Sequence, residues 1–310
     1  NNIKVPMSND LINRIQEAQK KFFNNGHTKS IDNRIAALKL LRNIIEKNEE
    51  NIFEALRLDL NKSKTEAYTS EIAYILTDID IAIRNLKRWS KPEKVRTSLI
   101  NMPGRSLIVK EPFGIALIIA PWNYPFNLLF GPMVSAIAAG NCVIAKPSEI
   151  ASASAKLIHK LISENFPEEY IAVVEGDADI TQKLINQNID YIFFTGSTAI
   201  GKKIMESAAK HLIPVTLELG GKNPCIIDED TDLDVSARRV LWGKFFNAGQ
   251  TCVAPDYLLV HKNIQSAFIA KLKEIVQQFY GNDEALQANF THIINVKQFE
   301  RLNGLLSEGT

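Results

Sequence analysis

Apolar residues in the first third of the chain recur at intervals of three and four positions. Three stripes of this kind follow one another: Leu11, Ile15, Ala18 and Phe22; Ile35, Leu38, Leu41 and Ile45; and Ile72, Ile75, Ile79, Ala82 and Leu86. This spacing places the apolar side chains on one face of an α-helix. Pro92 ends the third stripe, because proline cannot continue a helix. The pattern predicts an N-terminal helical region over residues 1–105.

From residue 106 the pattern of apolar residues changes to short apolar runs that alternate with stretches of helical period. The runs are IALIIA, CVIAK, IAVVEG, YIFFTG, PVTLELGG and PCIID. Helices are expected at about 128–139, around Ile158, at about 198–210 and at about 232–246. Strands that alternate with helices of this length indicate βαβ units, in which a parallel sheet is covered on both faces. We therefore predict an α/β fold with a doubly wound parallel sheet.

Residues 112–145 contain no charged side chain, which is a property shared with membrane-spanning segments. A bilayer-spanning helix needs about 20 consecutive apolar residues. This stretch is interrupted by Pro121, Asn123, Pro125, Asn127, Gly131 and Pro132. It is better interpreted as a buried strand, a polar loop, a helix and a second strand, so we predict no membrane span.

Composition and charge narrow the class of protein. The chain has 310 residues, of which 45% are hydrophobic and 23% charged, as is typical of a soluble globular protein large enough for two domains. Its 36 basic and 35 acidic side chains leave a net charge of +1, and no basic run is clustered. We predict no nucleic-acid partner and no binding to anionic membranes, since both need clustered Lys and Arg.

Only three cysteines occur, namely Cys142, Cys225 and Cys252, without a C-x-x-C pair or zinc-like spacing. We therefore predict no metal site, and a reducing compartment. The N-terminal residues contain no apolar signal segment, so we predict a cytoplasmic location.

Polar segments follow four of the apolar runs, and in doubly wound sheets ligands bind at the carboxyl ends of the strands. In TGSTAIG, the residues Gly196, Ser197 and Gly201 open a helix whose free N–H groups could face a phosphate, or they form an ordinary capped helix start. In KPSE, Lys146 and Glu149 could contact the hydroxyls of a ribose, or simply end a strand. Both interpretations remain open for both segments.

Two further residues could carry chemistry. Glu218 is followed by Gly220 and Gly221, which permit close backbone approach, so its carboxylate could act as a general base or be merely solvated. Cys252 follows a polar turn that contains Gly249, where a thiol can be partly exposed near backbone amides. The other two cysteines lie in apolar runs and are most simply buried packing residues.

Five segments together resemble the aldehyde dehydrogenase superfamily. They are, in chain order, PWNYPF, AKPSE, FFTGSTAIGKKIM, PVTLELGGKNP and WGKFFNAGQTCVAPDY. WNYP, GSTAIG and TCVAPDY resemble its class 3 branch, which handles aromatic and medium or long-chain aliphatic aldehydes. The resemblance runs from about Phe113 to the end of the chain.

The resemblance implies a reaction and a set of residues. Cys252 matches the nucleophile, Glu218 the general base and Asn123 the oxyanion donor of an NAD(P)-dependent aldehyde oxidation that passes through a thioester. NAD is the expected cofactor and NADP is possible. The matching cofactor contacts are Lys146, Ser148, Glu149, Gly196, Ser197 and Gly201. The matching positions in the aldehyde tunnel are Tyr124, Leu128 and Phe245.

The resemblance also implies a domain organisation. Residues 106–218 match the Rossmann-like NAD(P)-binding domain, and residues 219–310 match part of an α/β catalytic domain. Family members extend well beyond the last residue of this sequence, including the segment that contacts the nicotinamide ribose. We therefore expect these 310 residues alone to bind cofactor without sustaining turnover, and the complete protein to be a homodimer.

Three other functions compete with this interpretation. A cysteine hydrolase would need a histidine to activate its thiol, and none of the five histidines lies in these segments. A catalytically silent NAD-binding fragment or scaffold would bind NAD without aldehyde turnover. An enzyme that transfers the acyl group to coenzyme A would differ in its product, and Glu218 argues against it.

Overall fold

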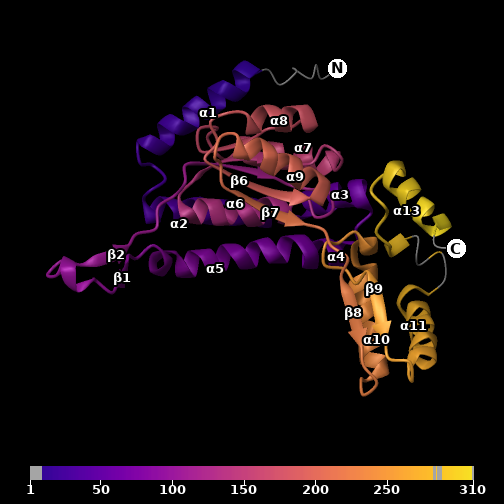
Figure 1. Ribbon diagram of the computed structural model, residues 1–310. Helices are drawn as coiled ribbons and strands as arrows, with labels where there is room; N and C mark the ends of the chain where they lie inside the picture. The colour runs from indigo at the N-terminus through magenta and orange to yellow at the C-terminus, as the bar shows by residue number, and fades with distance from the viewer. Residues whose placement is uncertain (1–8, 282–283, 285–287, 309–310) are drawn as a thin grey trace, which may run out of the picture.

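A parallel five-stranded sheet forms the centre of the protein in this computed structural model, which describes residues 9–281, 284 and 288–308 (Figure 1). Its strands lie in the order β5-β4-β3-β6-β7. Their bounds are Ile115–Ile119 for β3, Cys142–Lys146 for β4, Ile171–Val173 for β5, Tyr191–Gly196 for β6 and Val215–Leu219 for β7. The chain order reverses between β3 and β6, which is where doubly wound sheets bind their ligands.

Helices cover both faces of this sheet, as the alternating side chains of its strands require. In β3, Ala116 and Ile118 contribute to one core, whereas Ile115, Leu117 and Ile119 contribute to the other. The second core is covered by α1 (Asn9–Asn24), α8 (Ala178–Ile185) and α9 (Thr198–Ala209). The doubly wound prediction is confirmed.

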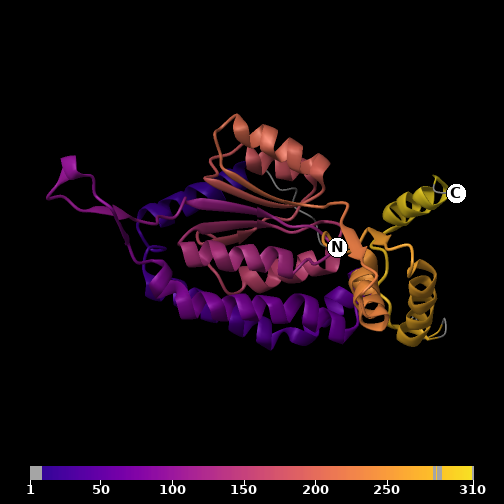
Figure 2. The same ribbon diagram turned by 60° about the horizontal axis from the view of Figure 1, so that its bottom comes forward.

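The face of the sheet toward Ala116 carries two layers of helices (Figure 2). The inner layer consists of α6 (Asn127–Ala139) and α7 (Ser152–Ser163). The outer layer consists of α2 (Ile31–Lys47), α3 (Glu49–Leu60) and α5 (Ala73–Trp89). Residues 112–145 form β3, a loop, α6 and β4, as expected from the interrupted apolar pattern. Among the described helices, none is long and apolar enough to cross a membrane.

The third apolar stripe of the N-terminal region is wholly buried, from Ile72 to Leu86. Most of it lies on α5, which ends at Trp89, just before Pro92. Ile72 belongs to a π-helical segment, Tyr68–Ile72, which follows the short helix α4 (Lys64–Ala67). The wider turn of a π segment changes the direction of the side chains that follow it.

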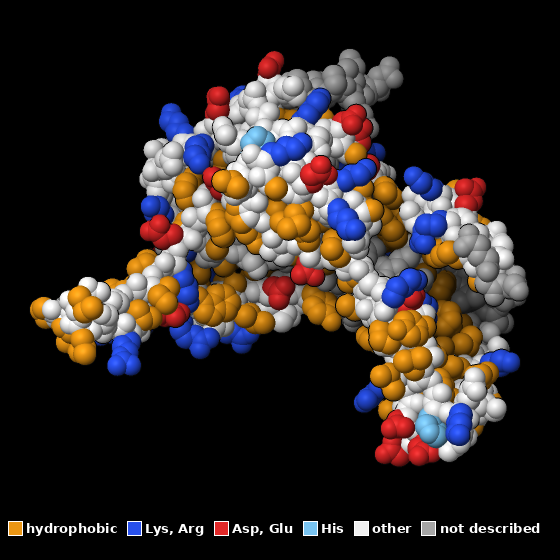
Figure 3. Space-filling view, in the orientation of Figure 1, with side chains coloured by type: hydrophobic (Ala, Val, Ile, Leu, Met, Phe, Trp, Pro, Cys, Tyr) orange, Lys and Arg blue, Asp and Glu red, His pale blue; other side chains and the backbone are white. Residues whose placement is uncertain are grey.

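A hairpin projects from the body of the protein, and the sequence analysis did not predict it (Figures 1 and 3). Its antiparallel strands are β1 (Glu93–Val95) and β2 (Ser106–Ile108), so the helical pattern does not continue to residue 105. The strands are three residues each, which is too short for alternation to indicate a strand. Apolar side chains remain exposed along this arm, including Leu99 and Ile100.

A second, smaller parallel sheet follows the last strand of the large sheet. It consists of β8 (Pro224–Ile227) and β9 (Tyr257–Val260). The helices α10 (Leu233–Phe245) and α11 (Gln265–Tyr280) pack against it around Phe268 and Ile275. This unit extends from the end of the body near α4, and α13 (Val296–Glu308) lies above α11 in this view, level with α3 (Figure 1).

Candidate active site

Cys252 lies in a sharp loop that follows α10. A short 3-10 turn, Phe246–Gly249, leads into the loop, and Asn247, Ala248 and Gly249 all have positive φ angles of 53°, 53° and 75°. A side chain at position 249 would be strained by this angle and would approach the Lys244 carbonyl oxygen to 3.0 Å. The loop leaves Cys252 with an exposed, unpaired thiol.

Asn247 holds this unusual backbone in place from inside the protein. Its side chain is fully buried, and its Nδ2 donates to the backbone oxygens of Gln250 at 3.1 Å and Asn123 at 3.0 Å. Gln250 returns a hydrogen bond from Nε2 to the Asn247 carbonyl at 3.0 Å. The three left-handed residues are thus stabilised by contacts that also reach the loop after β3.

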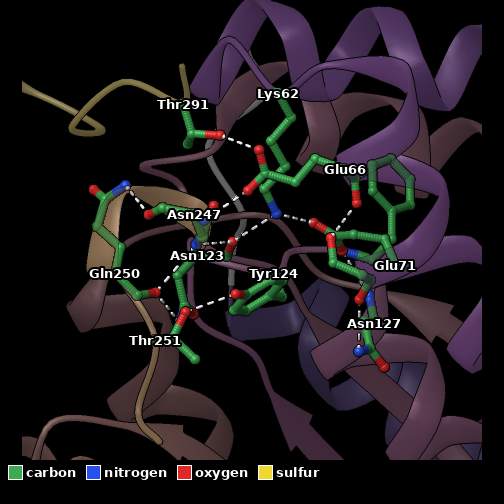
Figure 4. A network of polar contacts seen from close by, with 12 residues as sticks. Lys62, Glu66, Glu71, Asn123, Tyr124, Asn127, Asn247, Gln250, Thr251 and Thr291 are labelled. Atoms are coloured by element: carbon green, nitrogen blue, oxygen red, sulfur yellow. Dashed lines mark hydrogen bonds and ion pairs between the residues drawn. The ribbon is translucent and has the colours of Figure 1, made fainter. Parts of the chain in front are cut away.

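The loop after β3 is hydrogen-bonded to the cysteine loop (Figure 4). Asn123 Nδ2 donates to the Gln250 carbonyl oxygen at 2.8 Å, two residues before Cys252. The Tyr124 hydroxyl and Thr251 Oγ1 lie 2.6 Å apart. The structure therefore brings the predicted oxyanion donor to the loop that carries the predicted nucleophile.

The segment after β7 also contacts the cysteine loop. Asn223 Nδ2 donates to the backbone oxygens of Cys252 at 2.7 Å and Ala254 at 3.1 Å. Glu218 lies on β7 opposite Thr195 of β6, and its side chain is exposed. Its carboxylate has no hydrogen-bond partner within the described ranges. Solvent therefore reaches Glu218, as a general base for water requires.

The KPSE residues lie at the carboxyl end of β4. Lys146 is almost fully buried, and its Nζ forms an ion pair of 2.7 Å with Glu149 Oε2, which is 47% exposed. Ser148 is buried, and its Oγ accepts from the Ile150 backbone N–H at 3.3 Å. Lys146 and Glu149, which the sequence predicts on one ribose, thus also pair with each other.

The TGSTAIG residues open helix α9 at the end of β6. Ser197 caps the helix, with its side chain accepting from the Ile200 N–H at 3.4 Å. A Cβ at Gly196 would lie 2.5 Å from the Phe194 ring, and one at Gly201 would lie 2.8 Å from a methyl carbon of Leu219. The capped helix start is therefore present, and close packing accounts for both glycines.

The predicted tunnel residues are divided between two places. Tyr124 is nearly buried, and its carbonyl oxygen accepts from the Leu128 N–H at 2.9 Å on entry to α6. Phe245 packs instead in an aromatic cluster, with its ring centroid 5.4 Å from that of Tyr280 and 6.1 Å from that of Phe290.

A group of charged residues that no sequence motif indicated lies beside these loops (Figure 4). Lys62 Nζ and Glu71 Oε1 form an ion pair of 2.6 Å, and both side chains are fully buried. Glu66 accepts from the Asn247 N–H at 2.6 Å and from the Thr291 hydroxyl at 2.8 Å. The only signal in the sequence is that Glu71 directly precedes the buried stripe that begins at Ile72.

Burial shifts the pKa values of these groups. It lowers the pKa of Lys62 and raises that of Glu71, and the attraction between the two charges opposes both shifts. Burial also raises the pKa of Tyr124 well above its ordinary value, so its hydroxyl stays protonated near neutral pH. No group of His, Cys, Asp and Glu side chains suited to a metal ion occurs in residues 9–281, 284 and 288–308.

Comparison with known proteins decides the family. The model described as "Aldehyde dehydrogenase family" matches residues 4–310. The chain belongs to the aldehyde dehydrogenase family. This confirms the resemblance inferred from the sequence motifs.

Curated relatives in this family include class 3 members. Aldehyde dehydrogenase family 3 member B1 of Rattus norvegicus is 46% identical over 300 residues, which cover 97% of this chain and 63% of that protein. The 4,4'-diaponeurosporen-aldehyde dehydrogenase of Staphylococcus aureus is 47% identical over 288 residues, which cover 93% of this chain and 63% of that protein. The chain thus spans about 63% of the length of these relatives.

Solved aldehyde dehydrogenases share the fold. A structure described as the substrate-bound state of Staphylococcus aureus AldH matches with a TM-score of 0.92 and 46% identity, covering 96% of this chain and 65% of that one. The NAD-dependent aldehyde dehydrogenase of Sinorhizobium meliloti matches with a TM-score of 0.87 and 28% identity, covering 97% of this chain and 61% of that one. These matches confirm the α/β fold class.

Thiol accessibility in this aldehyde dehydrogenase chain gives a first test. We expect iodoacetamide to alkylate the exposed Cys252 first and the half-buried Cys225 more slowly. Cys142 should react only after unfolding, because it is buried and burial raises its pKa to about 12, whereas the thiolate is the reactive form. Peptide mass mapping at successive times would measure this order. Labelling of Cys142 as fast as Cys252 in folded protein would contradict the described packing.

Proposed function

We propose that the complete protein oxidises an aldehyde to its carboxylic acid with NAD(P), through a thioester on Cys252. One observation carries this proposal: Asn123 Nδ2 donates to the Gln250 carbonyl at 2.8 Å, which places an amide donor at the loop of an exposed thiol. Membership of the aldehyde dehydrogenase family supports it. Residues 106–218 would serve as the cofactor domain and residues 219–310 as part of the catalytic domain.

The first half of the reaction uses Cys252 and Asn123. The Cys252 thiolate adds to the aldehyde carbon, and the carbonyl oxygen becomes an alkoxide. The amide group of Asn123 has two N–H donors, of which one is bonded to Gln250, so the second can stabilise that alkoxide together with the Cys252 backbone N–H. A bound NAD or NADP would supply the acceptor for the hydride that leaves this carbon. The product on the protein is a Cys252 thioester.

The second half of the reaction uses Glu218. Its exposed carboxylate removes a proton from a water molecule, and the resulting hydroxide attacks the thioester carbon. The carbon–sulfur bond breaks, so the carboxylic acid leaves and the Cys252 thiolate is restored. An acyl transfer to coenzyme A would not need this base.

The cofactor residues fit a nucleotide at the switch point of the sheet. The N-terminus of α9, capped by Ser197, follows β6, and the Lys146–Glu149 pair follows β4. Lys146, Ser148, Glu149, Gly196, Ser197 and Gly201 would hold the cofactor. Glu149 partly neutralises Lys146 and would repel a 2′-phosphate, so NAD is preferred and NADP is also used.

Two broader features belong to the same proposal. We infer a cytoplasmic homodimer, since the cysteines are unpaired and a rat relative at 44% identity is named "Aldehyde dehydrogenase, dimeric NADP-preferring". The aldehyde would be aromatic or a medium or long-chain aliphatic one, with Tyr124, Leu128 and Phe245 lining its path.

A competing cysteine hydrolase finds no support at the cysteine loop. His292 approaches the loop through its backbone oxygen, which accepts from Gln250 Nε2 at 3.0 Å. Its ring instead lies beside Asn61, with Nε2 3.3 Å from the Asn61 amide nitrogen. A hydrolase of this type needs an imidazole beside the thiol.

Initial rates on the complete protein test the proposed function. With benzaldehyde or hexanal, we expect one carboxylic acid for each reduced cofactor, and a higher kcat/KM with NAD than with NADP. Absorbance of the reduced cofactor and chromatography of the acid would measure both. A folded, cofactor-binding protein that oxidises neither aldehyde would overturn the proposal, and strict dependence on NADP would overturn the cofactor assignment.

A further inference from the structure

The buried ion pair of Lys62 and Glu71 belongs to none of the sequence motifs that carry the proposed reaction. Lys62 lies between α3 and α4, and Glu71 lies in the π-helical segment Tyr68–Ile72. Both side chains are fully buried and their charged atoms are 2.6 Å apart. A buried ion pair is a weak source of stability, so stability alone does not account for this one.

Lys62 directs its ammonium group at the middle of the loop after β3. An ammonium group has three N–H donors. Lys62 Nζ donates to Glu71 Oε1 and, at 3.0 Å, to the carbonyl oxygen of Asn123. The same nitrogen lies 4.1 Å from the ring centroid of Tyr124, within the range of a cation–π contact. The lysine therefore contacts Asn123 and Tyr124, whose side chains reach the cysteine loop from the loop after β3.

Glu71 binds the main chain where the same loop ends. Its Oε2 accepts from the backbone N–H groups of Phe126 and Asn127, each at 3.0 Å. These residues begin helix α6, whose first N–H groups have no partner within the helix. One ion pair thus binds the main chain at both ends of the segment 123–127.

The Asn123 carbonyl oxygen contacts both the ion pair and the cysteine loop. It accepts from Lys62 on one side and from Asn247 Nδ2, also at 3.0 Å, on the other. The side chain of Asn123 donates in turn to Gln250. Fixing the main chain of Asn123 fixes where its side-chain amide points relative to Cys252.

We propose that the Lys62–Glu71 ion pair positions Asn123, so that its amide meets the developing alkoxide on Cys252. This role rests on the proposed function and adds two positioning residues to it, which act through the loop and touch neither substrate nor cofactor. Misplacement of a catalytic group by about 1 Å costs a factor on the order of a hundred in rate. Loss of the pair should therefore slow the first chemical step and leave cofactor binding unchanged.

A double-mutant cycle on the complete protein tests this role. The variants are Lys62→Met, Asn123→Ala and both together, and the readout is the single-turnover rate of NADH formation per alkylatable Cys252. We expect Lys62→Met to lower this rate by roughly ten- to a hundredfold, with an unchanged dissociation constant for NAD. In the Asn123→Ala background, Lys62→Met should lower the single-turnover rate by less than about threefold, because the amide that Lys62 positions is already absent.

Matched variants separate this role from general stability. Lys64→Met removes an exposed ion pair with Glu50 from the same segment and should leave the single-turnover rate unchanged. If Lys62→Met does not fold, Glu71→Gln takes its place in the cycle, because it removes the charge and keeps the size of the side chain. We expect the same loss of single-turnover rate, again dependent on Asn123. If Lys62→Met lowers the single-turnover rate by the same factor in the wild-type and the Asn123→Ala backgrounds, the positioning role is wrong. The proposed function would not be affected by that result. A wild-type protein without aldehyde turnover would overturn the proposed function and this role with it.

Discussion

Replacement of Cys252 by alanine in the complete protein is expected to lower aldehyde oxidation by at least about a thousandfold, because removal of a nucleophile eliminates the covalent step. Binding of NAD should persist, since the proposed cofactor residues lie at the carboxyl end of β4 and around the start of α9. Steady-state NADH formation and a fluorescence titration with NAD would measure the two effects.

The other cysteines provide matched controls for this substitution. Cys225→Ala should leave turnover nearly unchanged, because Cys225 lies within β8. Cys142→Ala should mainly lower stability, since it removes a fully buried thiol from β4. Retention of turnover by Cys252→Ala, or its loss in Cys225→Ala, would contradict the assignment of the nucleophile.

Glu218→Gln is expected to lower steady-state turnover by roughly a hundred- to ten thousandfold, the usual contribution of a general base. A neutral amide cannot take a proton from water, so hydrolysis of the thioester stops while hydride transfer continues. Stopped-flow absorbance should therefore show one burst of NADH per active site, followed by very slow turnover. Glu218 is exposed on β7, so the variant should fold normally.

The shape of the progress curve distinguishes this role from others. If Glu218→Gln loses the NADH burst as well as steady-state turnover, Glu218 contributes to cofactor binding or to the folded structure and not to thioester hydrolysis. Glu206→Gln, on α9, removes an exposed carboxylate elsewhere and should leave both phases unchanged.

The central sheet could be predicted from the sequence because its strands are buried on both faces. β3 and β4 are wholly buried, so each reads as a continuous apolar run that differs plainly from the helical stripes. The arm formed by β1 and β2 could not be predicted, since its short strands have exposed side chains and no alternation. Helix α8 was missed because it is only eight residues long.

The site could be predicted where its residues follow strands of the sheet. Asn123, Lys146 and Gly196 each stand at or just after a strand's carboxyl end, where topology alone brings side chains together. Burial of Lys62 and Glu71 depends on how α4 and the π-helical segment pack against the loop after β3. Charged residues in a helical region are usually solvated, and the place of Glu71 before a buried stripe is too weak a signal to mark it as an exception.

The position of Phe245 shows a further limit of sequence reasoning. Its ring packs with Tyr280 and Phe290 in the described chain, which no pattern in the sequence indicates, and its place beside the aldehyde stays a prediction. Tyr280 is at the end of α11, and Phe290 is far along the chain from Phe245. Contacts between residues so distant in sequence are set by the packing of the second sheet and its helices.

The most direct test of the account is the mass of the Glu218→Gln protein after mixing with hexanal and NAD and quenching in acid. We expect the peptide containing Cys252 to gain the mass of one hexanoyl group in place of a hydrogen, in proportion to the NADH burst. Cys142→Ala in the same background should not change this gain. An NADH burst without an acylated peptide, or acylation of Cys142 or Cys225 in place of Cys252, would contradict the claim that Cys252 carries the reaction.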